Sequence, residues 1–282
     1  MSQAAAPPRG EAATTPDGRA PAGRPGGRAR RLLSRVVPPV LALLVVLTLW
    51  QLGLFERFLG LQTYIVPEPA TIFSQFTSDW SAIWQAQWTT LVEAITGYVF
   101  GAVLGFALAV LVTATGLGRR FLPGVAGAIN AVPIVATAPI SVLYLGYGSS
   151  SKIAIVTVLT ASVMLLNANK GLNAVADDQV DLMHSYAATR WQVIVKLRAP
   201  SSLPFVFTAL KYNVTLALVA AIIAEFFGGF GGVGIEMVQA LSGFSLTLVW
   251  AAMVLVGVLG IAWYQIVSAT EWLATRSRPP EE

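Results

Sequence analysis

Apolar residues along this chain gather into six stretches separated by shorter polar segments. Each stretch holds few charged residues and is close to the ~20 residues that an α-helix needs to cross the hydrocarbon core of a bilayer. The pattern therefore predicts an all-α integral membrane protein with about six transmembrane helices, at roughly Val36–Leu54, Thr89–Thr115, Phe121–Leu145, Ile153–Ala168, Leu203–Phe227 and Ser245–Thr270.

Glycine and proline mark two of these stretches. Gly97, Gly101 and Gly105 recur every four residues in the second stretch. Such a strip lets another backbone approach closely, so we expect a packing surface, with a role in conduction as the alternative. Pro133 and Pro139 each remove a helix donor from the third stretch and should kink or break it. Freed backbone groups in a membrane must be buried or line a watery cavity, so Pro133 is a candidate for a pathway wall or a purely structural kink.

Polar side chains inside the apolar stretches are few. Those that could face a transport pathway, or alternatively bond a neighbouring helix, are Asn130, Tyr212, Asn213 and Thr215. Three carboxylates, Glu93, Glu225 and Glu271, are expected within a turn or two of a membrane face, where solvation is cheap. An ion-coupled carrier usually places ionisable groups near the midplane, so this placement argues against one.

The composition agrees with a membrane protein and excludes several other classes. Of 282 residues, 55% are hydrophobic and 11% charged, less than half of the about 25% charged residues usual in soluble domains. This excludes a disordered chain and most cytosolic enzymes. The chain has no cysteine, so it can form neither a disulfide framework nor a thiolate metal site.

The basic charge belongs to one short tail. Residues 1–35 hold seven arginines against two acidic residues, whereas the rest of the chain holds eleven Lys and Arg against twelve Asp and Glu. The tail has no apolar periodicity and is expected to be disordered. We therefore expect a disordered basic cytoplasmic tail (1–35), a transmembrane domain (36–273), a cytoplasmic tail (274–282) and no nucleic-acid partner.

Lys and Arg also predict the orientation. With both termini in the cytoplasm, sixteen of the eighteen cationic residues lie inside, and only Arg57 and Lys152 lie outside. Cytoplasmic loops carry such an excess, and an even number of crossings agrees with it. The external segment 55–88 holds three tryptophans that we expect to anchor the membrane interface rather than form a ligand cage, namely Trp80, Trp84 and Trp88.

Motifs for catalysis and nucleotide binding are lacking. No Gly-x-x-x-x-Gly-Lys-[Ser/Thr] sequence occurs, so the chain has no phosphate-cradling loop of its own. His184 is the only histidine, which excludes a multi-histidine metal site, and it lies in a polar loop. Residues 228–234 are rich in glycine, and we expect a flexible external turn there, with a gate or docking loop as the alternative. We predict no enzymatic activity and no cofactor on this chain.

The longest internal loop, roughly Asn169–Ser202, carries an amphipathic pattern. Thr189 is a candidate helix cap that divides it. Either the membrane interface or a partner protein must take the apolar faces of the two short helices that this pattern predicts. Their apolar residues are Val180, Met183 and Ala187 in the first and Trp191, Ile194 and Leu197 in the second.

Residue spacing in this loop matches a known signature that reads Glu-Ala-Ala, three residues, Gly, nine residues, Ile-x-Leu-Pro. Asp181 takes the Glu position, Met183 the second Ala, Ala187 the Gly and Pro200 the final Pro. The run from Tyr186 to Gln192 is close to Tyr-Gly-x-Ser-Arg-Trp-Gln. The loop thus resembles the cytoplasmic signature of binding-protein-dependent ABC importer permeases, in particular their nitrate/sulfonate/taurine branch.

Further matches in the same order extend this resemblance over about residues 60–270. They include Val66-Pro67-Glu68-Pro69, Ala131-Val132-Pro133-Ile134, Leu145-Gly146-Tyr147-Gly148, Ser151-Lys152-Ile153, Asn169-Lys170-Gly171-Leu172, Leu210-Lys211-Tyr212 and Ala224-Glu225.

The resemblance implies a type I ABC importer permease in a bacterial cytoplasmic membrane. Its internal loop would form a coupling helix seated on a separate ATPase subunit, which binds the ATP. An extracytoplasmic binding protein would deliver a small solute, such as a nitrate-, sulfonate- or taurine-like anion or a related metabolite, to a pair of permease copies. The residues that would contact or position the ATPase are Asp181, Met183, Tyr186, Ala187, Arg190, Trp191 and Pro200.

One residue of the loop departs from the family signature, and one alternative function stays open. Ala187 stands where the family has glycine, and we expect it to make the turn only at negative φ. The alternative function is an ion-coupled secondary carrier or a channel. Internal repeats or charge pairs at the midplane would favour that alternative, and the sequence shows neither.

Overall fold

The computed structural model describes residues 27–54, 60, 65–116, 124, 127–128 and 132–276, and the regular elements in these ranges are all helical. The chain divides into two compact units at residue 52. The first contains α1 (Gly27–Gln51), which begins inside the tail predicted to be disordered. Arg, Ala and Leu precede the apolar run and favour helix, so the helix extends ahead of it. The rest of that tail, Asn130 and residues 277–282 lie outside the described residues.

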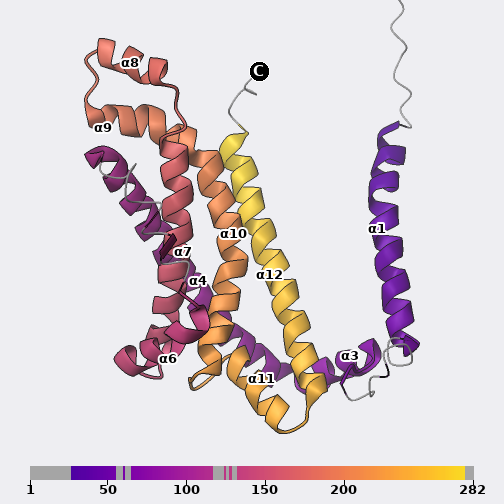
Figure 1. The fold of residues 1–282 in the computed structure, drawn as a ribbon. Helices are drawn as coiled ribbons and strands as arrows, with labels where there is room; N and C mark the ends of the chain where they lie inside the picture. Colours follow the sequence, from indigo (N-terminus) through magenta and orange to yellow (C-terminus); the bar gives the residue numbers. More distant parts are fainter. Residues whose placement is uncertain are drawn as a thin grey trace, which may run out of the picture. The chain divides into compact units, whose positions relative to one another are not determined.

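The second unit is a bundle of long helices with short helices at its ends (Figure 1). Its elements are α3 (Pro69–Ser78), α4 (Trp80–Thr115), α6 (Ile134–Leu145), α7 (Ser149–Leu172), α8 (Asp177–Ser185), α9 (Arg190–Val193), the π-helical turn η1 (Ile194–Arg198), α10 (Ala199–Phe226), α11 (Val233–Ser242) and α12 (Leu246–Thr275).

Four helical stretches in the described part of the chain are long and apolar enough to cross a membrane: α4, α7, the run Arg190–Phe226 and α12. The apolar part of α1 and the shorter α6 match the first and third predicted stretches. The all-helical membrane architecture is therefore confirmed. The short helices α3 and α11 were not predicted, because neither is long enough to stand out in a transmembrane window.

Helix α7 packs against both α4 and α10, and the core lies between these three helices. Small residues make this close packing possible. A Cβ atom on Gly97 would lie 2.6 Å from the Val156 Cβ of α7, and one on Gly101 would overlap the Thr160 hydroxyl. The packing role expected for the glycine strip is thus confirmed.

Helices α4 and α7 exceed their predicted stretches the most. Helix α7 extends four residues beyond the predicted stretch at each end, because polar side chains there, such as those of Ser151 and Asn173, bond backbone carbonyls and do not shorten the helix. Helix α4 begins at Trp80 rather than near Thr89. The three tryptophans of the predicted external segment therefore lie in its first turns, where Trp80 and Trp84 stack with their rings 5.6 Å apart.

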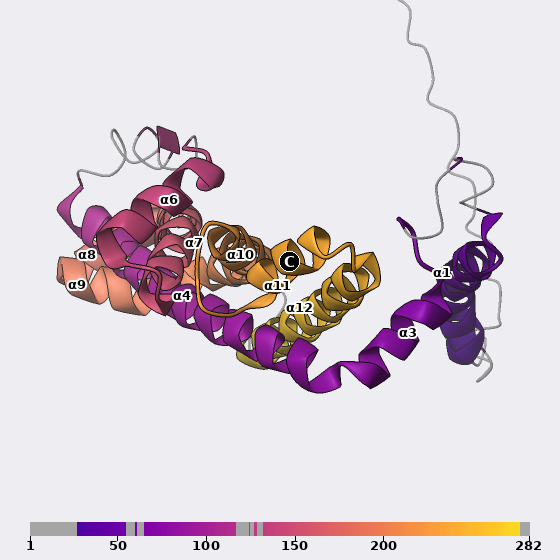
Figure 2. The same cartoon turned by 90° about the horizontal axis from the view of Figure 1, so that it is seen from below.

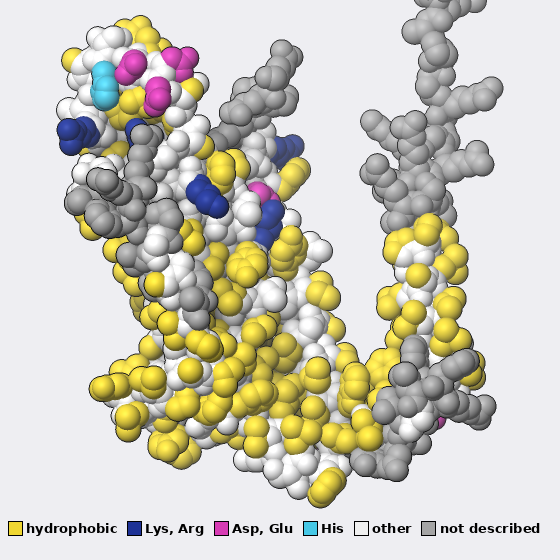
Figure 3. All heavy atoms as spheres, viewed as in Figure 1, with side chains coloured by type: hydrophobic (Ala, Val, Ile, Leu, Met, Phe, Trp, Pro, Cys, Tyr) yellow, Lys and Arg dark blue, Asp and Glu magenta, His cyan; other side chains and the backbone are white. Residues whose placement is uncertain are grey.

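The surface of this unit is divided by polarity. On the face shown in Figure 3, charged side chains gather over α8 and α9 and the adjoining ends of α10 and α12, whereas hydrophobic side chains cover the middle and the opposite end. Large apolar side chains of α4 and α12, such as Phe100, Val103 and Ile261, are exposed. An apolar middle with a charged end is the surface expected of a helix bundle in a bilayer.

Candidate functional site

The charged end of the bundle carries a helical hairpin that we call the coupling segment: α8, the turn 186–189 and α9 (Figure 1). Asp177 and Asp178 occupy the first turn of α8, where their negative charge interacts favourably with the positive end of the helix dipole. The helix closes with the Ala188 N–H donating to the Met183 carbonyl at 3.1 Å and the Ala187 N–H donating to the His184 carbonyl at 2.9 Å. This is the bond pattern of a Schellman cap.

Ala187 occupies the position of this cap that requires a left-handed backbone. Its φ is +55°, so the expectation of a turn at negative φ is wrong. The bonds of the cap impose this conformation, and glycine usually fills the position because it has no Cβ penalty. The alignment of Ala187 with the family glycine therefore matches the backbone, although the residue is strained there. Since α8 ends at Ser185, Ala187 also does not share its apolar face.

Replacing Ala187 by glycine should stabilise the coupling segment. The left-handed conformation costs alanine about 1 kcal/mol, and part of this gain is offset by the greater freedom of glycine in the unfolded chain. We expect hydrogen exchange of the α8 amides to slow by roughly twofold to fivefold in Ala187→Gly. Ala188→Gly, one residue further on, is the control and should not slow exchange. Equal or faster exchange in Ala187→Gly would contradict the strain.

Helix α9 begins with the capping box that the sequence suggested. The Gln192 N–H donates to the Thr189 hydroxyl and the Thr189 N–H donates to the Gln192 side chain at 2.7 Å. From α9 the chain continues through η1 into α10 as one helical run. The π-helical turn ends two residues before Pro200, which has no N–H to donate to the carbonyl one turn earlier. Helical structure therefore continues through the proline.

The coupling segment turns an apolar surface outward. Val193 and Ile194 are buried and Val180 and Met183 are half-buried, which fixes the hairpin to the bundle. Trp191, expected on the same face, is instead 63% exposed. Other exposed residues of the segment include Asp181, Leu182, Tyr186, Ala187 and Arg190. Large exposed side chains flanked by charges are typical of a protein-docking surface.

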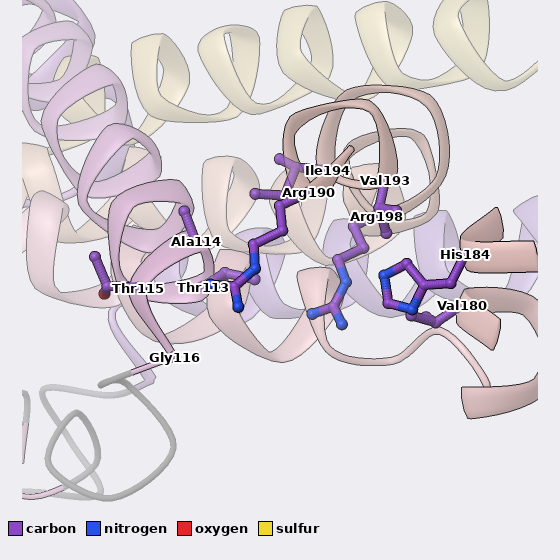
Figure 4. Close-up of a pocket in the computed structure, with 10 residues that line it drawn as sticks. All are labelled: Thr113, Ala114, Thr115, Gly116, Val180, His184, Arg190, Val193, Ile194 and Arg198. Atoms are coloured by element: carbon purple, nitrogen blue, oxygen red, sulfur yellow. The ribbon is translucent and has the colours of Figure 1, made fainter. Parts of the chain in front are cut away.

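A cavity of about 370 Å³ lies between this hairpin and the end of α4 (Figure 4). The side chain of Arg190 extends toward the last turn of α4, whose carbonyl end carries partial negative charge. Arg198 donates to the Asn173 amide oxygen at 3.1 Å. Arg198 thus connects η1 to the residue that follows α7, and Arg190 lines the cavity beside the end of α4. Sequence reasoning missed Arg198 because its partner follows α7, 25 residues earlier.

The candidate pathway residues separate into two groups. Asn213 is fully buried, and its amide donates to the Thr160 carbonyl of α7 at 3.0 Å. Tyr212 and Thr215 are exposed on another face of α10, and Pro133 is exposed at the start of α6. The exposed positions of α10 recur at helical spacing and form a stripe of Phe205, Thr208, Tyr212, Thr215 and Val219. Phe205 and Thr208 were not singled out in the sequence, where burial on a uniformly apolar helix is not visible.

The three carboxylates near the membrane faces were expected to be solvated by water, and the structure contradicts this expectation. Glu93 and Glu225 are fully buried at the end of the bundle opposite the coupling segment. Glu93 pairs with buried Lys152 at 3.1 Å. Glu271 is partly buried and pairs with Lys211 of α10 at 2.8 Å. Glu93 and Glu271 are therefore paired within the protein, although Glu93 Oε2 has no hydrogen-bond partner among the described residues.

Comparisons with known proteins agree with this arrangement. Residues 101–271 match the family described as "Binding-protein-dependent transport system inner membrane component". A riboflavin transport system permease protein of Chloroflexus aurantiacus is 26% identical over 87% of this chain and 93% of its own length. A formylaminopyrimidine transport permease protein of Halalkalibacterium halodurans is 28% identical over 84% of this chain and 94% of its own length. A nitrate import permease protein of Leptolyngbya laminosa is 24% identical over 94% of this chain and 95% of its own length.

Solved structures share the fold at low sequence identity. A chain of the MetNI methionine ABC transporter in inward-facing conformations superimposes with a TM-score of 0.59 at 20% identity, over 67% of this chain and 94% of that one. A chain of a bacterial ABC transporter involved in alginate import superimposes with a TM-score of 0.60 at 14% identity, over 89% of this chain and 100% of that one. Family, relatives and fold all describe a multi-pass transport subunit whose ATPase is a separate protein. The chain belongs to the binding-protein-dependent inner-membrane components, the permease subunits of ABC importers.

Proposed function

We propose that the coupling segment docks on the ATPase subunit and that its displacement drives solute movement through the bundle. The single observation that carries this proposal is the hairpin itself, whose inner side is partly buried whereas Trp191, Tyr186 and Leu182 are exposed. Water does not stabilise so much exposed apolar surface, so a protein groove is its natural partner. In this proposal ATP binds only to the partner subunit, and this chain binds no cofactor.

The coupling segment lies on the cytoplasmic side in this proposal. Its end of the bundle carries Lys170, Arg190, Lys196, Arg198, Lys211 and Arg276. At the opposite end, Lys152 is buried in an ion pair. Cationic residues are retained on the cytoplasmic side of membrane proteins. The C-terminus of α12 is then inside, and six crossings would place the N-terminus inside as well.

The exposed stripe of α10 supports a pathway shared between two copies of the chain. It combines the hydroxyl groups of Thr208, Tyr212 and Thr215 with apolar neighbours. Hydroxyl groups facing lipid gain little, whereas they can bond a solute in a watery cavity. Because the stripe is open on one side in a single chain, a second copy would close the pathway. Neutral hydroxyl donors suit a small solute rich in acceptors, such as an oxyanion or a polar heterocycle like those named for the relatives.

Reconstitution tests this function. The chain should be purified with its ATPase subunit, placed in liposomes and supplied with a solute-loaded binding protein. We expect solute uptake that requires ATP and binding protein together, because neither subunit alone contains both a pathway and a nucleotide site. Uptake by this chain alone, without nucleotide, would overturn the proposal in favour of a carrier or channel.

A further inference from the structure

A cluster of buried charged and polar side chains lies at the end of the bundle opposite the coupling segment. We call Thr90, Glu93, Lys152 and Glu225 the charge cluster. Thr90 and Glu93 come from α4, Lys152 from the first turn of α7 and Glu225 from the last turn of α10. Each has almost no exposed surface. Lys152 donates to Glu93 at 3.1 Å, and the Thr90 hydroxyl donates to Glu225 at 2.7 Å.

The cluster fixes the start of α11. The backbone N–H of Gly234 donates to Glu225 at 2.6 Å, and that of Val233 donates to the Thr90 hydroxyl at 2.9 Å. Both N–H groups belong to the first turn of α11, which has no intrahelical partners for them. Figure 2, which looks onto this end of the bundle, shows α11 lying beside the ends of α10 and α12. Side chains of α4 and α10 therefore determine where α11 begins.

The loop of residues 227–232, which we call the glycine loop, lies directly on the same charges. The Lys152 ammonium is 3.5 Å from the Gly231 carbonyl. A Cβ atom on Gly229 would lie 2.5 Å from that ammonium, and one on Gly232, where φ is +106°, would overlap the Glu225 carboxylate. The segment was expected to be a free external turn, but its glycines let the backbone close over buried charges. Phe230 at its tip is 95% exposed.

Stability alone does not account for this arrangement. Burying an ion pair costs more desolvation than a packed apolar set of the same size would. The cluster holds two carboxylates and one ammonium, the ammonium pairs with Glu93 alone, and Glu93 Oε2 has no hydrogen-bond partner among the described residues. Departures of this kind from a fully satisfied interior are retained mainly where they specify one of several arrangements. Any relative movement of α4, α7 or α10 would separate members of the cluster.

Glu225 of the charge cluster and α9 of the coupling segment lie on one continuous helical run. The run Arg190–Phe226 is 37 residues long, which corresponds to roughly 55 Å at 1.5 Å per residue. Trp191 lies at its first turn and Glu225 at its last. One helical run therefore joins Trp191, where a partner would apply a displacement, to Glu225.

We propose that the charge cluster is a latch that holds the glycine loop and α11 in the resting permease and must open during each transport cycle. Thr90, Glu93, Lys152 and Glu225 are thus positioning residues: they contact no solute but set the energy needed to move the loop end. This inference rests on the proposed function, because the force that opens the latch comes from the ATPase through the coupling segment.

Nucleotide hydrolysis by the reconstituted complex tests the latch. Glu225→Gln and the double variant Glu93→Gln/Lys152→Met loosen the resting state, so hydrolysis without binding protein should rise about fivefold while its stimulation by loaded binding protein shrinks in proportion. The matched control is Lys211→Met/Glu271→Gln, which removes the Lys–Glu pair that joins α10 to α12, and it should change both rates by less than about twofold.

The rates of hydrolysis distinguish a latch from a merely structural cluster and from a failure of the proposed function. If the variants keep the stimulation ratio of the unmodified complex and only melt at a lower temperature, the cluster is structural and the latch is refuted. If the unmodified complex itself is not stimulated by loaded binding protein, the proposed function fails before the latch is tested, and the latch falls with it. A raised unstimulated rate confined to the cluster variants supports the latch.

A reporter on the loop gives a second readout that needs no partner. The chain has no cysteine, so Phe230→Cys provides one site for a nitroxide spin label at the exposed tip. Thr90→Val keeps the shape of the side chain but removes its hydroxyl, and it should increase the mobility of the label, whereas Thr90→Ser should not. Equal mobility in Thr90→Val, Thr90→Ser and the unmodified chain would show that the cluster does not hold the loop and would overturn the proposal.

Discussion

Trp191→Ala should weaken the attachment of the ATPase subunit to this permease by roughly thirtyfold in dissociation constant, because truncating a central interface tryptophan costs about 2 kcal/mol or more. Trp191 is 63% exposed on the coupling segment and contributes little to the buried core of the bundle. The fold should therefore persist while stimulated hydrolysis and uptake are lost. Titration of the ATPase subunit against the detergent-solubilised permease measures the change.

A second tryptophan provides the matched control. Trp272 of α12 is exposed to a similar degree and lies at the same end of the bundle, but outside the coupling segment, where it packs beneath the Arg276 guanidinium at 5.0 Å. Trp272→Ala should leave the dissociation constant within about twofold, as expected of a residue outside the contact. Equal losses in the two variants, or no loss in Trp191→Ala, would count against docking through the α8–α9 hairpin.

Gly101→Leu should unfold the bundle at a lower temperature, with a loss of about 3 kcal/mol or more. A side chain at this position meets the Thr160 hydroxyl and the Thr157 carbonyl, the latter at 2.7 Å from the added Cβ. The carbonyl belongs to the α7 backbone and cannot rotate away, so α4 and α7 would have to separate. Thermal unfolding in detergent, followed by tryptophan fluorescence, gives the shift in midpoint.

Gly257→Leu makes the same chemical change where there is room for it. Gly257 lies on α12 and has no atom within 4 Å of an added Cβ. Its replacement should alter the free energy of unfolding by about 0.5 kcal/mol or less. If both leucine variants unfold at the same temperature, close contact between α4 and α7 is not the reason for the glycine strip.

Much of the fold followed from hydropathy. Four long apolar helices, α1 and α6 all overlap predicted stretches, because a bilayer requires runs of about 20 apolar residues whatever their contacts. The ends of α4 and α7 did not follow, since polar residues there continue the helix and find partners inside the protein. The hairpin of α8 and α9 was located through the spacing from Asp181 to Pro200, which depends on short-range helix and turn geometry.

Several features of the site escaped sequence reasoning for one reason. Whether Glu225 meets water or Thr90 depends on a residue 135 positions away, and the same is true of Lys152 and Glu93, 59 positions apart. The left-handed backbone at Ala187 arises from a cap whose bonds prevail over the preference of alanine. On α10, the difference between buried Asn213 and exposed Tyr212 is set by the position of α7.

The amino-acid sequence by itself determined that this chain crosses a membrane and the approximate positions of its long helices, and it predicted which segment would engage a partner. These properties depend on side-chain chemistry and on spacings of a few residues, which a sequence displays directly. Only the tertiary structure decided which faces of the helices are closed, that the glycine loop lies against buried charges, and that Glu225 shares a helical run with α9. Such properties arise from contacts between residues distant in the chain, and the free energy of a buried charge depends on those contacts rather than on its neighbours in sequence.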